Sequence, residues 1–373
     1  MEFESNPDSN TPHLLLLGLR RSGKSSIQKV VFAKMPPNDT LYLGTTTKTD
    51  ARPAIKSFID LQIWDCPGQI DYLEEGVFDA QNIFANAGAI VYVIDAQDDF
   101  TDSLIRLQST IEHAYKINPE INFEILIHKV DGLSDDNKQG TLDMISQQVS
   151  EEIAEMGIPV EPSYYLTSIY DHSVFEAFSK IIQKLLPQLG TLENLLTAFA
   201  EKSGIEKAYL FDTLTKIYIA TDASPVDMQS YEICSDMIDV IIDFECIYGK
   251  RPPEMDEAPM VAPMQYMMPQ DDDQPAEDGL YNQSVVESEG SSLIRLSNGM
   301  VLYLREVNRL LLLICLLRSD NLEKRGLIDY NFQCFKKAIV EIFEVTKGAR
   351  QAHRIDDGMA RIQNGFTDSL RED

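Results

Sequence analysis

The chain has 373 residues, with 32 Lys and Arg against 60 Asp and Glu, so its formal net charge is −28 at pH 7. This length predicts two to three domains, and an apolar content of 44 % is enough to fill their cores. The excess of acid excludes a protein that binds nucleic acid through its own charge, because phosphate contacts require clustered Lys and Arg. It also disfavours direct binding to anionic membrane surfaces. A small, local phosphate pocket remains compatible with it.

The cysteines and the two ends of the sequence bear on the compartment of the protein and on membrane anchoring. No two of the five cysteines form a CxxC pair, which is typical of reduced thiols in a cytoplasmic protein. Residues 1–11 are polar and acidic, unlike a signal peptide, and we expect them to be disordered. Glu2 excludes N-myristoylation, and the final Leu-Arg-Glu-Asp excludes a prenylation box. We therefore expect no direct membrane anchor.

Short apolar runs alternate with amphipathic segments in the first half of the chain. Strands are predicted over residues 14–17, 58–64, 89–94, 123–127 and 163–166, and helices over residues 25–34, 100–115 and 174–186. This alternation predicts an α/β domain with a mostly parallel sheet and helices on both faces. Pro187 and Gly190 mark its end, so we assign it residues 12–190.

The second half follows another pattern. Helices are predicted from residue 191 and over residues 228–248 and 321–345, and strands over residues 208–211, 217–220, 292–296, 300–304 and 310–317. Ser297-Asn298-Gly299 is a hairpin turn signal between two of these strands. Adjacent, hairpin-linked strands predict a small α+β domain with an antiparallel sheet, over residues 191–346.

Two segments lack the pattern of a folded core. Residues 250–291 hold repeated Pro and Met, with 10 acidic and 2 basic residues, and are predicted to be a disordered acidic insertion. Residues 347–373 mix Gly, Arg, Asp and Gln without an apolar period and are predicted to be a disordered tail.

The segment from Gly18 to Ser25 matches G-x-x-x-x-G-K-[ST], between a predicted strand and a predicted helix. Its two glycines let backbone N–H groups surround phosphate oxygens, Lys24 places a charge at the β- and γ-phosphates, and the Ser25 hydroxyl is a ligand for Mg²⁺. The alternative is a chance match in an ordinary turn. The residues predicted to bind phosphate are Arg21, Ser22, Gly23, Lys24, Ser25 and Ser26.

Two further segments are candidates for sensing the γ-phosphate. Asp65 ends a predicted strand, followed by Gly68 and Gln69, and Gln69 stands where a water-orienting catalytic glutamine is expected. The polar loop over residues 39–47 supplies threonines. The residues assigned to the switch are Thr40, Thr46, Asp65 and Gly68, and Thr46 is also assigned to Mg²⁺, ahead of its neighbours in the run of three threonines. An ordinary polar loop explains the second segment equally well.

Base recognition is predicted at two later strand ends. His128-Lys129-Val130-Asp131 corresponds to Asn/Thr-Lys-x-Asp, in which the aspartate accepts hydrogen bonds from guanine N1–H and the exocyclic amine. His128 departs from the usual Asn. Ser168 and Ile169 follow the next strand, where a second base-contacting segment is expected. Ordinary polar loops are the alternative for each segment alone.

Together these motifs resemble the Rag GTPase family, and specifically its RagC/RagD type, in which His at position 128 is usual. The resemblance covers about residues 12–346 and rests on the segments LRRSGKSS, WDCPGQ, HKVD, TSIYDHS, FEAFSK, SGIEKAYLFD, SPVDMQSYE and GLIDYNF. It implies a Ras-like GTPase domain followed by a roadblock/longin-like dimerisation domain. The ligands that it implies are GTP or GDP with Mg²⁺.

The resemblance also implies partners. They are a RagA/RagB-type GTPase in an obligate heterodimer, a lysosomal scaffold complex that carries the lipid anchors, the TOR kinase complex and a GTPase-activating protein. The chain would be cytoplasmic, with a nuclear pool also considered, and active in amino-acid signalling when bound to GDP. Two alternatives stay open: a nucleotide-locked scaffold with negligible turnover, and a P-loop ATPase or nucleoside kinase.

Overall fold

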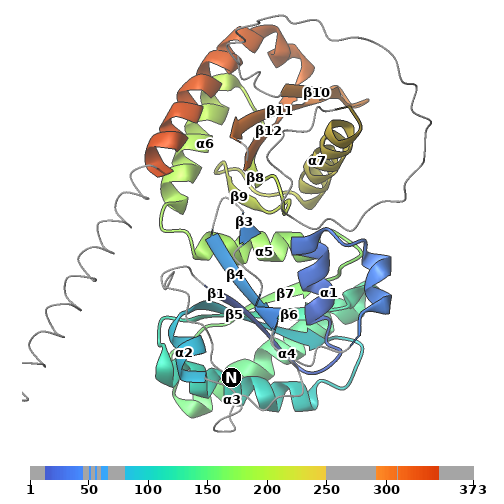
Figure 1. Cartoon of the computed structure of the whole chain (residues 1–373), viewed down its shortest axis with the longest axis vertical. Helices are drawn as coiled ribbons and strands as arrows, with labels where there is room; N and C mark the ends of the chain where they lie inside the picture. The colour runs from blue at the N-terminus through green and yellow to red at the C-terminus, as the bar shows by residue number, and fades with distance from the viewer. Residues whose placement is uncertain are drawn as a thin grey trace, which may run out of the picture.

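The computed structural model describes residues 13–44, 50–51, 55–56, 60–65, 80–248, 291–308 and 310–343. It has two layered units, each built on one sheet (Figure 1). The segments predicted to be disordered lie outside the described residues, except that Ser291 already belongs to a strand. Within the described residues, no helix is both long enough and apolar enough to cross a bilayer.

The first unit is built on a mostly parallel sheet with the strand order β2-β4-β1-β5-β6-β7. Its parallel strands are β1 (His13–Leu17), β4 (Asp60–Asp65), β5 (Ala87–Asp95), β6 (Asn122–His128) and β7 (Ser163–Thr167). Two short strands, β2 (Asp50–Ala51) and β3 (Ile55–Lys56), pair antiparallel with β4. The parallel strands all end at the same edge of the sheet, so the loops that follow them converge there.

Helices cover both faces of this sheet. They are α1 (Lys24–Ile27), α2 (Ala80–Ala85), α3 (Thr101–Ile117), α4 (Asp135–Met156) and α5 (Ser173–Lys184). Alternate residues of β1 show why the strands are apolar throughout: Leu14 and Leu16 pack towards α1 and α5, whereas Leu15 and Leu17 pack towards α2, α3 and α4.

The second unit is an antiparallel sheet with the strand order β10-β11-β12-β8-β9. Its elements are α6 (Leu189–Ser203), β8 (Lys207–Asp212), β9 (Tyr218–Thr221), α7 (Met228–Tyr248), β10 (Ser291–Arg295), β11 (Met300–Asn308), β12 (Leu311–Arg318), a 3₁₀ turn (Ser319–Lys324) and a helix over residues 325–343. The helices α6 and 325–343 pack on one face and α7 on the other. The predicted fold class is confirmed in both units.

One predicted helix differs from the structure, and two observed helices, α2 and α4, have no predicted counterpart. The helix predicted over residues 25–34 is α-helical only to Ile27 and continues as a π-helix over Gln28–Phe32. Helix α4 was not predicted at all, because its apolar face is thin. Only Ile145, Val149 and Ile153 are buried along its length, at a spacing of four residues. That spacing was the available signal.

Helix α5 joins the two units (Figure 1). The backbone N–H of Tyr218 in β9 donates to Ser179 Oγ at 3.1 Å, and Gln183 Nε2 donates to the Tyr218 carbonyl at 3.3 Å. At the start of the helix, His172 Nε2 lies 3.5 Å from Asp236 Oδ1 of α7. The apolar cluster under α1 and α5 continues into the second unit. The two sheets are therefore packed around one shared helix.

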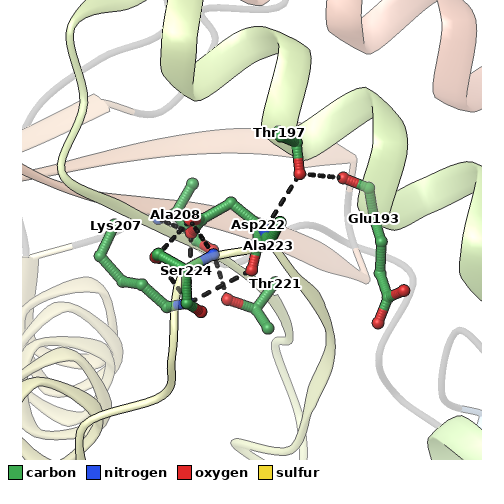
Figure 2. A network of polar contacts seen from close by, with 8 residues as sticks. All are labelled: Glu193, Thr197, Lys207, Ala208, Thr221, Asp222, Ala223 and Ser224. Carbon is green, nitrogen blue, oxygen red and sulfur yellow. Dashed lines mark hydrogen bonds and ion pairs between the residues drawn. The ribbon is translucent and has the colours of Figure 1, made fainter.

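A buried polar network holds the end of the β8–β9 pair (Figure 2). Lys207 and Asp222 are 6 % and 7 % exposed, and Lys207 Nζ lies 3.3 Å from Asp222 Oδ1. Asp222 also accepts the Ala208 N–H at 2.8 Å, and Thr197 of α6 accepts the Ala223 N–H at 3.0 Å. Burial acts to raise the pKa of Asp222, but its hydrogen bonds from Ala208 and Ser224 lower that pKa overall. Burial lowers the pKa of Lys207, and the charge of Asp222 opposes that shift, so the two groups form a hydrogen-bonded ion pair inside the fold.

Candidate functional site

The loop between β1 and α1 is shaped by three residues in the left-handed region. Gly18 has φ 134°, Arg21 φ 67° and Gly23 φ 107°. A Cβ on Gly18 would lie 2.3 Å from the Val93 carbonyl oxygen of β5, so only glycine fits there. The turn keeps its backbone close to the neighbouring strand end.

Lys24 closes this loop from inside. Its side chain is only 6 % exposed, and its Nζ donates to the carbonyl oxygens of Gly18 at 2.9 Å and Leu19 at 2.8 Å. Ser25 and Ser26 follow at the start of α1 and line the same cavity as Lys24. The loop therefore presents an ammonium group and two hydroxyl groups towards one space.

His128 lies beneath the loop. The residue is 1 % exposed, and its Nδ1 lies 3.0 Å from Thr167 Oγ1. A Cβ on Gly23 would lie 2.6 Å from His128 Cδ2, so the ring edge packs directly on that glycine. Burial, reinforced by the charge of Lys129, lowers the pKa of His128 to about 4. The residue is therefore a neutral spacer between the loop at Gly23 and the loop at Thr167.

We expect His128 to make the protein less stable as the pH falls from 7.5 to 5.5. The histidine is protonated below about pH 6.5 in the unfolded chain but stays neutral in the folded chain. The free energy of unfolding therefore falls by about 1 kcal/mol between pH 7.5 and pH 5.5. Denaturant unfolding at both pH values should show a smaller loss in the His128→Asn variant. Parallel losses in the two proteins would contradict a neutral, buried His128.

Lys129 connects the same loops by another route. Its φ is 65°, and its Nζ donates to the Arg21 carbonyl oxygen at 2.8 Å and pairs with Asp95 Oδ2 at 2.5 Å. Gln97 Nε2 donates to the Lys129 carbonyl oxygen at 2.7 Å. The ammonium group of Lys129 therefore links the end of β5 to the Gly18–Ser25 loop, while its backbone follows β6.

Asp131 is positioned by the loop after β7. Ser168 Oγ donates to Asp131 Oδ1 at 2.7 Å and accepts the Tyr170 N–H at 3.1 Å. The Ser168 N–H in turn donates to Ser173 Oγ at 2.9 Å, at the start of α5. Ser168 is fully buried, and its hydrogen bond holds the Asp131 carboxylate in position.

These groups surround one cavity of about 570 Å³. It is lined by Arg20, Arg21, Gly23, Lys24, Ser25, Ser26, Thr40, Leu41, Leu43, Gly44, Gln97, His128, Lys129, Asp131, Ile169 and Tyr170. Its size and its polar groups suit a small ligand. The Lys24 loop and Asp131 both line it, so one space combines an ammonium group with a carboxylate.

Most of the predicted site residues are brought together here. Ser22 and Ser168 are buried beside the cavity and do not line it. Thr40 lies in a 3₁₀ turn (Pro37–Tyr42), and its hydroxyl donates to the Pro37 carbonyl oxygen at 2.7 Å. The backbone of Asp65 ends β4, as predicted. The predictions for Thr46, Gly68 and Gln69 lie outside the described residues.

Sequence reasoning did not select Asp95, Gln97 or Tyr170. Asp95 and Gln97 follow β5, and a signal was available, because they stand at the same sheet edge as the predicted motifs. Tyr170 directly follows the predicted Ser168-Ile169 pair, and this adjacency was the available signal.

Comparison with known proteins identifies the family of the chain. The family model described as the Gtr1/RagA G protein conserved region matches residues 13–238. The chain belongs to the Rag/Gtr family of GTP-binding proteins. The first unit is therefore a Ras-like G domain, and the ligand class of the family is a guanine nucleotide.

Rag/Gtr relatives of two types match the chain. Ras-related GTP-binding protein C of Homo sapiens is 54 % identical over 91 % of this chain and 78 % of its own length. GTP-binding protein gtr2 of Schizosaccharomyces pombe is 53 % identical over 88 % of this chain and 97 % of its own length. Ras-related GTP-binding protein B of Rattus norvegicus is 30 % identical over 56 % of this chain and 63 % of its own length. The resemblance to the C/D type is confirmed.

Proposed function

We propose that the chain binds GTP and GDP through the described cavity and hydrolyses GTP as a molecular switch. One observation carries this: the Asp131 carboxylate, fixed by Ser168, shares a cavity with the buried Lys24 loop. A carboxylate accepts two hydrogen bonds from the guanine N1–H and amine, and adenine offers no such pair. The lysine and the loop N–H groups suit phosphates.

The cavity also fits Mg²⁺ as the partner of the phosphates. Mg²⁺ takes hard oxygen ligands and usually keeps phosphates and waters in its shell. Ser25 brings a hydroxyl next to Lys24 on the cavity wall. In the proposed site Ser25 and Thr46 hold the ion, which neutralises phosphate charge, while Thr40, Asp65 and Gly68 belong to the switch.

Intrinsic hydrolysis is proposed to be slow. Gln69 is the proposed water-orienting residue, and the two arginines on the cavity wall, Arg20 and Arg21, belong to the phosphate loop. An arginine supplied by a partner is typically worth 10³–10⁵ in rate. A GTPase-activating protein is therefore part of the proposal.

The chain is further proposed to be the C/D-type half of a heterodimer with an A/B-type GTPase. The C-terminal unit, a roadblock-like domain in this proposal, would form the dimer. The support is the likeness to both types of relative, with far higher identity to the C type. In the proposal the GDP-bound chain signals amino-acid sufficiency to the TOR kinase complex, on a scaffold at the lysosome.

The experiment is single-turnover hydrolysis of radiolabelled GTP by the purified chain, with and without a cell extract as the source of activator. Identification of co-purifying proteins and of the eluted nucleotide accompanies it. Hydrolysis that the extract accelerates supports the switch. Tight GTP binding with no hydrolysis in either condition would indicate a nucleotide-locked scaffold, and equal competition by ATP would overturn the guanine assignment.

A further inference from the structure

Gln97 makes a contact between two strand ends that the proposed binding scheme does not use. It follows β5, and its side chain is exposed on the cavity wall. Its Nε2 donates to the carbonyl oxygen of Lys129, after β6, at 2.7 Å. Fixing an exposed glutamine in one conformer costs side-chain entropy, and the backbone that it holds is the start of the turn with Asp131.

That backbone is in an unfavourable conformation. Lys129 has φ 65° and ψ 35°, in the left-handed region, where a residue with a Cβ is less stable than in the right-handed one. It directly precedes a 3₁₀ turn (Val130–Gly132), and the Gly132 N–H donates to the same Lys129 carbonyl oxygen at 3.4 Å. A backbone outlier of this kind persists only where its surroundings hold it. The orientation of the Lys129 peptide therefore sets the direction of the turn on which Asp131 lies.

Lys129 is held at both of its ends from the end of β5. Asp95 Oδ2 pairs with the Lys129 ammonium at 2.5 Å, and Asp95 Oδ1 accepts the Gln97 N–H at 3.0 Å. The Gln97 amide in turn holds the Lys129 carbonyl oxygen. The three residues form a closed ring of hydrogen bonds, which ties both the side chain and the backbone of Lys129 to one strand end.

Gly132 leaves room for this contact. A Cβ on Gly132 would lie 2.3 Å from Gln97 Nε2 and 2.6 Å from the amide carbon of Gln97. The φ of Gly132 lies outside the left-handed region, so its backbone alone does not require a glycine. The residue must be small because the Gln97 amide packs directly on it.

We infer that Gln97 is a positioning residue, which holds the turn with Lys129 and Asp131 in its base-binding geometry before a nucleotide arrives. The inference rests on the proposed function. Ser168 holds the carboxylate of Asp131, and Gln97 holds the backbone that precedes it. Loss of Gln97 should therefore speed nucleotide release and weaken the selection of the base.

The test measures release of methylanthraniloyl-GDP from the full-length chain after addition of excess GDP. Gln97→Ala should release it about fivefold faster, the size expected for one lost hydrogen bond. Gln97→Glu keeps the shape but loses the donor, and should be at least as fast; a wild-type rate would overturn a role through this hydrogen bond. Gln147→Ala is the matched control, because Gln147 donates to Glu151 at 2.9 Å on exposed α4, and it should leave the rate unchanged.

Gly132 supplies a second way to displace the Gln97 amide. Gly132→Ala should speed release about as much as Gln97→Ala, because the new methyl group takes the place of the amide. The double variant should be no faster than either single one, since the same contact is lost only once. Gly140→Ala, at a glycine of α4 with open space around it, is the control and should not change the rate. Effects that multiply to about 25-fold in the double variant would overturn the inference.

A base-selective readout separates positioning from a general loss of stability. Inosine lacks the exocyclic amine whose hydrogen bond Asp131 accepts in the proposed site, so the affinity ratio of GDP to IDP reports on the placement of that carboxylate. Gln97→Ala should lower this ratio, whereas a purely structural role would leave it unchanged. An unchanged ratio in a chain that prefers guanine would overturn the role of Gln97 alone. Failure of the wild-type chain to prefer guanine over adenine nucleotides would overturn the proposed function as well.

Discussion

Replacing Asp131 by Asn is expected to shift the base preference from guanine to xanthine by about 10²–10³-fold. In the proposed site the carboxylate accepts hydrogen bonds from the guanine N1–H and amine, whereas the amide of the variant would bring a donor NH₂ group against the amine. A guanine amine that faces another donor in a desolvated site has no acceptor, and such an unmade hydrogen bond strongly lowers affinity. Xanthine carries a carbonyl oxygen where guanine carries its exocyclic amine, and this oxygen can accept a hydrogen bond from the amide NH₂ group of the variant. The measurement is competition of GDP and XDP against a fluorescent nucleotide.

Two control variants test whether the change in base preference is due to the Asp131 carboxylate itself. Asp135→Asn removes a carboxylate four residues away, at the exposed start of α4, and should leave the preference unchanged. Ser168→Ala removes the 2.7 Å hydrogen bond to Asp131 and should weaken guanine binding without favouring xanthine. A guanine preference that survives in Asp131→Asn would show that another residue reads the base.

The second large effect is expected in the C-terminal unit. Asp222→Ala should lower the free energy of unfolding by about 3–5 kcal/mol, because it leaves the Lys207 ammonium buried without its partner. The loss includes the hydrogen bond from the Ala208 N–H, which Asp222 accepts at 2.8 Å. Denaturant unfolding of the wild type and the variant at neutral pH measures the difference.

Two further variants test whether the unpaired, buried charge of Lys207 causes this loss of stability. Glu206→Ala breaks the ion pair with Arg318, which is 71 % exposed, and should cost less than about 1 kcal/mol. The double variant Lys207→Met, Asp222→Leu removes both charges and should recover part of the loss, since well-packed apolar residues often replace a buried pair. A double variant as unstable as Asp222→Ala would mean that the backbone hydrogen bonds, and not the uncompensated charge, dominate.

The elements that the sequence pattern predicted best are those with a continuous apolar run or a strong period. Strand β5 lies within two residues of its predicted bounds at each end, because its burial on both faces leaves almost no polar residue to disturb the run. Helix α4 shows the opposite case: three buried residues among many exposed ones give too weak a period, although the sheet needs that helix as a cover.

The chemical groups of the site could be predicted from the residues alone: the lysine and glycines of the loop at Gly18–Ser25, and the lysine and aspartate at Lys129 and Asp131. These groups follow the ends of predicted parallel strands, and such strand ends share one edge of a sheet. How these groups hold one another in place follows only from the packing of the folded chain. Contacts such as His128 beneath Gly23 and Lys129 on the Arg21 carbonyl join residues about a hundred positions apart. No local pattern encodes such contacts, because they arise only when the strands pack side by side.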